Sequence, residues 1–189
     1  MTPFPAFIDT NCLFGAYLCD TLLRLAEAGI YRPLWSAGVL EELERNLLRR
    51  GLSPDAVSYR IGQMRLWFPD AEVCGYESLI DAMTCDEKDR HVLAAAVRAE
   101  AQVLVTFNGA DFPDTSLSQY DIVVSSPDDF LLDQLDLYPG HVIAALRAQA
   151  GAYKAPPMAV EDLLGRLATA GVPHFASAVA RHLQGPGGY

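Results

Sequence analysis

Short apolar segments alternate with longer segments of helical periodicity along the first 135 of the 189 residues. Strands that alternate with helices pair in parallel through right-handed crossover connections. The pattern therefore predicts an α/β fold with a mostly parallel sheet. The expected strands are residues 4–8, 31–35, 71–74, 102–106 and 121–125.

Start and stop signals locate the expected helices between these strands. Ser36 and Ser53 are typical N-caps, and Pro54 suits a first helical position. Glycines close two of the helical patterns, where the left-handed conformation that ends many helices is accessible. The expected helices are residues 11–28, 37–50, 54–68, 86–101 and 127–135.

The composition changes after residue 135. Residues 1–135 hold 21 acidic and 10 basic side chains, whereas residues 136–189 hold three and four. Proline and glycine breaks divide this last segment into three helical patterns without a strand signal. We therefore expect a sheet domain over residues 1–135 and a helical C-terminal extension over residues 136–189.

Four acidic residues lie where an expected strand ends or an expected helix begins, and they are Asp9, Glu42, Asp89 and Asp111. The carboxyl ends of parallel strands meet at one crevice, so these side chains are expected to converge. Clustered carboxylates stay ionised together when a cation offsets their charge, and oxygen ligands suit Mg²⁺ or Mn²⁺. Such a site, without a nucleotide-binding loop, points to metal-assisted hydrolysis of a phosphodiester.

Each acid also has a purely structural interpretation. Asp9 could cap the helix that begins near Asn11, and Glu42 could be a solvated helix residue like its neighbours. Asp86 and Asp89 have the spacing of an N-cap and a third helical residue, which satisfies free amides and the helix dipole. Asp111 and Asn108 could form an Asx-type turn.

Other chemistries lack their motifs. The sequence contains neither GxGxxG nor GxxxxGK[ST], and its four histidines have no ligand spacing such as HExxH. Asn11 stands where haloacid-dehalogenase-like phosphatases need a second aspartate. No apolar run approaches 18 residues, and the first residues lack a secretory signal, so we expect a cytoplasmic protein without a membrane span.

A net charge of −10 argues against broad electrostatic capture of nucleic acid. The segment from Arg45 to Arg65 nevertheless holds five arginines against the single acid Asp55. We expect Arg45, Arg49 and Arg50 to bind the phosphates of a polyanion locally. The alternative is a solvated helix face.

The four acidic motifs resemble, in order, those of PIN-domain ribonucleases, and in particular the VapC-type toxins of toxin–antitoxin pairs. The resemblance covers about residues 5–130. Its motifs are Ile8-Asp9-Thr10-Asn11, Val39-Leu40-Glu41-Glu42-Leu43, Asp86-Glu87-Lys88-Asp89 and Thr106-Phe107-Asn108-Gly109-Ala110-Asp111.

This resemblance implies a three-layer α/β/α PIN-like sandwich and an endoribonuclease that depends on Mg²⁺ or Mn²⁺. Asp9, Glu42, Asp89 and Asp111 would be catalytic metal ligands, with Asp86 as a further ligand. Supporting roles fall to Asn11, Thr106 and Asn108, and Thr106 is placed to bond a carboxylate or a phosphate.

The partners implied are an RNA substrate such as tRNA, a cognate antitoxin protein and a second copy of the chain in a homodimer. The helical tail resembles an extension found in a VapC subgroup. The alternative function is a catalytically weak PIN-like module for RNA binding or assembly.

Overall fold

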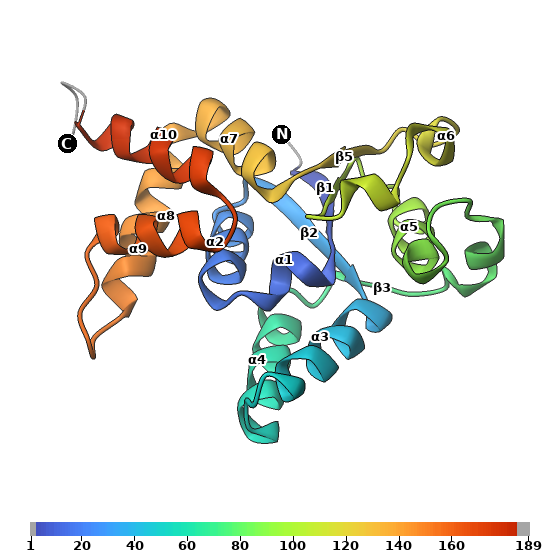
Figure 1. Cartoon of the computed structure of the whole chain (residues 1–189), viewed down its shortest axis with the longest axis horizontal. Coiled ribbons are helices and arrows are strands. Elements are labelled where there is room, and N and C mark those ends of the chain that lie inside the picture. Colours follow the sequence, from blue (N-terminus) through green and yellow to red (C-terminus); the bar gives the residue numbers. More distant parts are fainter. Residues whose placement is uncertain (1–2, 185–189) are drawn as a thin grey trace. The chain divides into compact units, whose positions relative to one another are not determined.

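The computed structural model describes residues 3–184 and contains one five-stranded sheet (Figure 1). The strand order is β3-β2-β1-β4-β5, and every neighbouring pair is parallel. The strands are β1 (Phe4–Ile8), β2 (Tyr31–Ser36), β3 (Glu72–Val73), β4 (Val103–Val105) and β5 (Val123–Ser125). The predicted α/β fold with a parallel sheet is confirmed.

The strand order creates a topological switch point between β1 and β4. The chain builds the sheet outward from β1 to β3 on one side and then crosses to β4 and β5 on the other. Ligands of open α/β sheets bind at such a point, beyond the carboxyl ends of the strands. Asp9 directly follows β1 and donates its backbone N–H to Val105 at 3.0 Å, while Thr106 directly follows β4. Both residues therefore flank the switch point.

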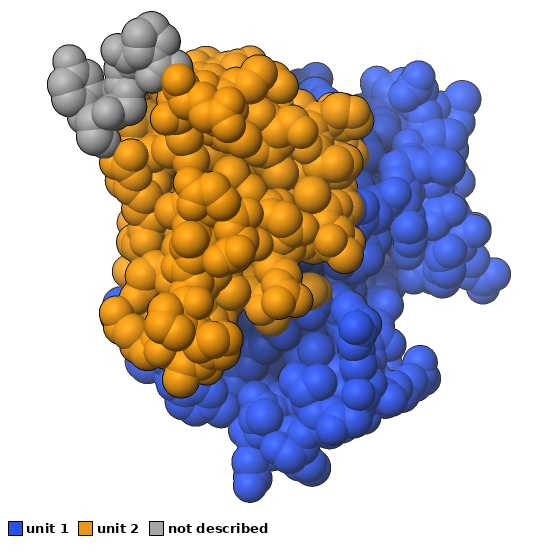
Figure 2. Space-filling model, turned by 60° about the vertical axis from the view of Figure 1, so that its left-hand side comes forward, with its two compact units in different colours: residues 1–14, 31–125 blue, residues 15–30, 126–189 orange. Residues whose placement is uncertain are grey.

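The chain divides into two compact units, coloured separately in Figure 2. Unit 1 comprises residues 1–14 and 31–125, and unit 2 comprises residues 15–30 and 126–189. This division differs from the boundary expected after residue 135. The segment 15–30 groups with the C-terminal helices, although it lies between the first two strands of the sheet.

The helices of unit 1 alternate with the strands along the chain, and they contain or flank the four acidic residues of the predicted site. The longest three are α3 (Ala37–Arg49), α4 (Pro54–Trp67) and α5 (Arg90–Arg98). The shorter elements are α1 (Thr10–Phe14), η1 (Glu77–Ala82), η2 (Glu87–Asp89), η3 (Gly109–Asp111) and α6 (Asp114–Leu117). No sequence signal predicted η1, η3 or α6.

Two helix starts follow the predicted caps. The Ser36 hydroxyl accepts a hydrogen bond from the backbone N–H of Val39, and Ser53 accepts one from Ala56. Each cap satisfies one of the free amides at a helix start. The first cap fixes where α3 begins, and therefore where Glu42 lies relative to the end of β2.

Two helix predictions were wrong in their bounds. The single helix expected over residues 11–28 is divided by Gly15, whose backbone is extended (φ −70°, ψ 124°). The helix expected over residues 86–101 begins as the 3-10 turn η2, because Asp86 caps Lys88 and Asp89 has bridge-region dihedral angles (φ −103°, ψ 0°). That helix ends before Glu100, which has a φ of +52°.

Unit 2 is a bundle of helices held by an apolar core. The helices are α2 (Ala16–Glu27), α7 (Pro127–Leu137), α8 (Pro139–Ala152), α9 (Val160–Thr169) and α10 (Pro173–Gln184). The last three match the three helical patterns predicted after residue 135. The buried side chains include Leu22, Leu25, Leu146, Leu163, Leu167 and Phe175.

Two polar contacts fix the helices of unit 2. The Thr21 hydroxyl of α2 donates to the side-chain carbonyl of Gln149 on α8 at 2.7 Å. Buried Asp128 on α7 accepts from the backbone N–H groups of His174 and Phe175 and contacts the His174 ring nitrogen. Asp128 therefore satisfies free amides at the start of α10, a role usually filled by a local cap.

None of the helices in residues 3–184 has the length and apolarity needed to cross a lipid bilayer.

Candidate active site

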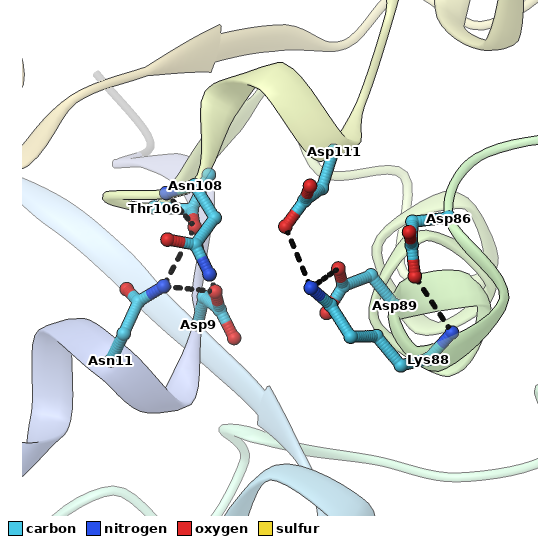
Figure 3. Close-up of polar contacts among 8 residues, drawn as sticks. All are labelled: Asp9, Asn11, Asp86, Lys88, Asp89, Thr106, Asn108 and Asp111. Atoms are coloured by element: carbon cyan, nitrogen blue, oxygen red, sulfur yellow. Dashed lines mark hydrogen bonds and ion pairs between the residues drawn. The ribbon is translucent and has the colours of Figure 1, made fainter.

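Asp9 is the most constrained acid at the switch point, and its carboxylate accepts three hydrogen bonds. The Thr106 hydroxyl and the Asn11 side-chain amide each donate to Oδ2 at 2.7 Å. The backbone N–H of Thr10 donates to Oδ1 at 2.6 Å. Asp9 is buried, so these donors replace the water that an exposed carboxylate would have. They hold the carboxylate in one orientation (Figure 3).

The donors to Asp9 are themselves linked to the loop after β4. The Thr106 hydroxyl oxygen accepts from Asn11 and from the backbone N–H of Asn108, both at 3.0 Å. The side-chain oxygen of Asn11 accepts from the backbone N–H of Phe107 at 3.2 Å. The three residues predicted to support the site therefore form one network with Asp9, and Asn108 joins it through its backbone.

Burial raises the pKa of Asp9 above its ordinary value, because a buried carboxylate loses its hydration. Hydrogen bonds from Thr106 and Thr10 oppose this effect, since they favour the charged form. The Glu42 carboxylate raises the pKa further, and His91 lowers it. These couplings place Glu42 and His91 within electrostatic reach of Asp9.

Glu42 reaches the site through Thr10. The Thr10 hydroxyl lies 3.2 Å from Oε2 of Glu42 and 3.3 Å from the carbonyl oxygen of Val39, so its one proton is shared. Glu42 is half-buried, whereas Glu41 and Glu44 are exposed. Among the acids of α3, Glu42 is therefore the one directed toward Asp9.

Asp89 and Asp111 meet at the ammonium group of Lys88 (Figure 3). The Lys88 Nζ atom lies 3.1 Å from Oδ2 of Asp111 and 3.7 Å from Oδ2 of Asp89. Asp111 comes from η3 after β4, and Asp89 comes from η2 before α5. Two acids that are 22 positions apart in the sequence thus share one cation.

The pKa of Asp89 is raised to about 6, mainly by burial. Lys88 opposes this shift, while the carboxylates of Asp9 and Asp111 add to it. Oδ2 of Asp89 is buried and has no hydrogen-bond partner in the part of the chain that the structure describes. A buried carboxylate oxygen that accepts no hydrogen bond is costly, and it is the kind of atom that a bound cation would satisfy.

Asp86 adopts the structural role that the sequence allowed for it. Its side chain accepts from the backbone N–H of Lys88 at 3.2 Å and caps η2. Its own backbone N–H donates to the carbonyl oxygen of Asp111 at 3.1 Å. Asp86 therefore connects the two loops that carry Asp89 and Asp111.

The donor set of these acids fits a hard divalent cation. The side chains are carboxylates, which Mg²⁺ and Mn²⁺ prefer, and Oδ2 of Asp89, which accepts no hydrogen bond from any described residue, lies among them. Within residues 3–184, however, no three His, Cys, Asp or Glu side chains are already close enough to hold a metal ion. Metal binding would require the carboxylates to close around the ion.

The arginines expected to bind RNA lie along the C-terminal half of α3 and at its end. Arg45, Arg49 and Arg50 are all exposed. The Arg50 guanidinium lies 5.3 Å from the centre of the Phe14 ring, which is a cation–π contact. Arg45 and Arg49 remain the most accessible positions of the three for a polyanion.

The other two arginines of this segment serve the fold. Arg60 donates to the carbonyl oxygens of Leu13 and Phe14 at the end of α1. Arg65 forms an ion pair with Glu72, with its Nε atom 2.7 Å from the carboxylate.

Three residues near the acids were not among the site residues predicted from the sequence. Thr10 bridges Asp9 and Glu42, and Lys88 joins Asp89 and Asp111. The imidazole of His91 lies beside Gly38 of α3, where an added Cβ would be 3.2 Å from its Nδ1 atom. Lys88 could have been noticed, because a single lysine stands inside the acidic motif of residues 86–89. His91 could not have been found in this way, because its spacing from other residues matches no metal-ligand motif.

Comparisons with known proteins agree with this architecture. The PIN domain family model matches residues 5–110, and the VapC50 C-terminal domain model matches residues 127–181. Over 107 residues, the chain is 50% identical to "Putative ribonuclease VapC50" of Mycobacterium tuberculosis. That match covers 57% of this chain and 63% of the relative, so the chain spans less than two thirds of that protein. No solved structure matches the chain.

Proposed function

Because the chain belongs to the PIN domain family, we propose that it is a divalent-metal-dependent endoribonuclease of the VapC toxin type. The family match includes β1 through Ala110, and therefore the segments that carry Asp9, Glu42 and Asp89. The match to a VapC50 C-terminal domain over residues 127–181 supports the VapC type in particular. The name of the Mycobacterium tuberculosis relative supports RNA as the substrate.

The observation that carries the proposal is the convergence of acids from four separate segments at one sheet edge. Asp9 follows β1, Glu42 lies on α3, Asp89 ends η2 and Asp111 ends η3. Asp9 is coupled to Glu42, and Asp89 is coupled to Asp9 and Asp111. A cluster of mutually repelling carboxylates destabilises the fold, so a role for them in binding a cation is the simplest explanation.

The proposed ligands of Mg²⁺ or Mn²⁺ are Asp9, Glu42, Asp89 and Asp111, with Asp86 as a further candidate. When bound, the ion would supply a water of lowered pKa and neutralise charge on the scissile phosphate. The chain's own residues hold the metal ligands in position in advance. Thr106, Asn11 and Thr10 hold the Asp9 carboxylate in place before any substrate arrives. Thr10 also holds Glu42 near it.

The proposed substrate is RNA, with tRNA as the first candidate and the cytoplasm as the place of action. Arg45, Arg49 and Arg50 would contact its phosphates. Cleavage by this class would leave a 5′-phosphate and a 3′-hydroxyl. We also propose a homodimer and control by a cognate antitoxin protein, whose basic side chain could pair with the acidic cluster.

A second candidate function is RNA binding or assembly by a catalytically weak PIN-like module. One observation favours it. Lys88 already bonds to Asp111, and no metal-binding trio is assembled among the described residues. If Lys88 kept this position permanently, cation binding and hydrolysis would be suppressed.

The test is cleavage of total RNA by the purified full-length chain, with Mg²⁺, with Mn²⁺ and with a chelator, followed by mapping of the cut ends. We expect cleavage only with a divalent cation, and its loss in Asp9→Asn. RNA that binds without being cut under all three conditions would instead support the second candidate. Cleavage that persists in the chelator would contradict the metal-dependent mechanism.

A further inference from the structure

Lys88 is placed as a cation inside the acidic cluster rather than beside it. Its Nζ atom is 3.1 Å from Oδ2 of Asp111 and 3.7 Å from Oδ2 of Asp89. These are the same carboxylate oxygens that a metal ion between the two acids would approach. A divalent cation and the Lys88 ammonium would therefore compete for them.

The backbone directs Lys88 to this position. Asp86 accepts a hydrogen bond from the Lys88 N–H, and Asp89 donates its own N–H to the Asp86 carbonyl oxygen at 2.9 Å. The tight 3-10 turn of η2 places Lys88 directly before Asp89. The Asp86 N–H bond to Asp111 draws the second carboxylate toward the same turn.

The ammonium group of Lys88 can move away from the acidic cluster. The Lys88 side chain is 64% exposed, so its ammonium group can turn into water without losing a packed apolar environment. Asp89 cannot move away in the same way, because its side chain is only 15% exposed and its backbone is fixed at the start of α5. Displacement of Lys88 therefore requires only a side-chain rotation.

The charge of Lys88 explains how the cluster persists without a metal. Asp9, Asp89 and Asp111 repel one another at the switch point, and burial adds to the cost of their ionised forms. One ammonium within contact distance of two of them offsets part of this repulsion. A divalent cation would offset more of it, and it would also satisfy Oδ2 of Asp89, which has Lys88 at 3.7 Å but accepts no hydrogen bond within the described ranges.

We propose that Lys88 is a built-in counter-ion that holds the metal-free site together and is displaced from Asp89 and Asp111 when a divalent cation binds. This inference rests on the proposed metal-dependent function and adds a switch to it. Lys88 holds the metal-free chain in an inactive arrangement, and cation uptake is coupled to the release of this one lysine side chain.

The first experiment measures Mn²⁺ affinity of the full-length chain by titration calorimetry and by the free-Mn²⁺ spin-resonance signal, without any RNA. Removing the competing charge in Lys88→Met should tighten Mn²⁺ binding by about two- to fivefold, which is the scale of one exposed charge pair. Lys88→Arg keeps the charge and should remain closer to wild type. A smaller gain, no change or weaker binding in Lys88→Met would overturn the proposal.

Lys154 supplies a matched control, because it is exposed and is the second of only two lysines in the chain. Lys154→Met should leave Mn²⁺ affinity unchanged. An equal gain in both variants would mean that net charge, rather than the position of Lys88, controls cation binding, and this result would also overturn the proposal.

A second experiment needs no variant and so does not depend on whether Lys88→Met folds. The wild-type chain is treated with an amine-acylating reagent, and the modification of Lys88 relative to Lys154 is measured by peptide mass spectrometry. We expect this ratio to rise on addition of Mg²⁺, because Lys88 leaves its carboxylate partners. An unchanged or lower ratio would show that Lys88 stays in place.

These experiments distinguish a failure of the proposed role of Lys88 from a failure of the proposed function. If the wild-type chain binds no Mn²⁺, the proposed metal-dependent function and the proposed role of Lys88 are both wrong. If wild type binds Mn²⁺ and cleaves RNA, but Lys88→Met and the labelling ratio show no effect, only the role of Lys88 is lost.

Discussion

The Thr106 hydroxyl donates a 2.7 Å hydrogen bond to the carboxylate of Asp9 across the switch point of the sheet. The two residues are 97 positions apart in the sequence, and each directly follows a central strand. This bond ties the ends of β1 and β4 together and fixes the acid that the proposed chemistry depends on most.

Replacing Thr106 by valine should destabilise the chain by about 1 to 3 kcal/mol, because buried polar groups lose their partner. The affected groups are the Asp9 carboxylate, the Asn11 amide and the Asn108 N–H. Urea unfolding measures this loss. Thr106→Ser keeps the hydroxyl and should retain most of the stability. Equal losses in the two variants would show that the hydroxyl, which only Thr106→Ser retains, is not the source of the stability.

The metal-free chain should become less stable as the pH rises from about 4 to about 7. The pKa of Asp89 is about 6 in the fold and 3.8 without it, and that of Asp9 is also raised. Between these values the folded chain binds more protons than the unfolded chain, so the free energy of unfolding falls with increasing pH. Melting temperatures at pH 5 and pH 7.5, without metal, measure the slope.

Asp89→Asn is the matched variant for this pH experiment. It should flatten the slope and raise the melting temperature at pH 7.5, because it removes a buried negative charge from the cluster. Added Mg²⁺ should stabilise wild type at pH 7.5 more than it stabilises Asp89→Asn. A slope that is identical in wild type and variant would mean that Asp89 does not carry it.

Glu42 and Glu41 allow a test on neighbouring residues of one helix. Glu42 is half-buried and bonded to Thr10, whereas Glu41 is exposed. Glu42→Gln should lower RNA cleavage by about 100-fold or more, the scale of a lost transition-state interaction, while Glu41→Gln should leave it near wild type. Single-turnover cleavage rates measure both. Comparable rates in the two variants would remove Glu42 from the proposed ligands.

The exposed arginines of α3 can be tested by the salt dependence of RNA binding. Each phosphate contact to a single strand contributes about 0.7 to the slope of log affinity against log salt. Arg45→Ala combined with Arg49→Ala should therefore reduce the slope by about 1.4. Arg65→Ala is the control, since Glu72 already neutralises Arg65. An unchanged slope in the double variant would mark these arginines as a solvated face.

Asp128 should be the most sensitive acid of unit 2. It accepts two backbone hydrogen bonds at the start of α10 and is buried. Asp128→Ala should cost about 2 to 3 kcal/mol, because buried donors to a charged group lose their acceptor. Asp133, which is exposed on the same helix, provides the control variant. Chemical denaturation followed by circular dichroism measures both.

Local signals in the sequence were sufficient for the sheet and for most helix starts. The caps at Ser36 and Ser53 form the predicted bonds, because capping depends on residues only three positions apart. The parallel pairing of the strands followed from the alternation of elements, whereas their order in the sheet was not predicted. The helix break at Gly15 was not predicted, because the apolar spacing of α1 continues into α2 although the backbone between them is extended.

The acids of the candidate site were also predictable, because strand ends converge at a switch point. The sequence indicated Thr106 as a partner for a carboxylate or a phosphate, but it could not show which acid Thr106 bonds or which groups the other acids contact. The pairing of Asp9 with Thr106 and that of Asp111 with Lys88 depend on loop conformations, as does the selection of Asp128 as a cap for α10. Such contacts join residues 23 to 97 positions apart, where no periodic pattern applies.

The interleaving of the two compact units has a consequence for the chain during its synthesis. Helix α2 is made early, but the partner of its Thr21, Gln149, follows 128 residues later. At a rate of about 5 to 20 residues per second, that delay is roughly 6 to 26 s. Throughout this time the leucines of α2 have no native neighbours from α8 or α9 on the nascent chain. Unit 2 can therefore close only late in translation, and until then the apolar face of α2 stays open to chaperones on the ribosome.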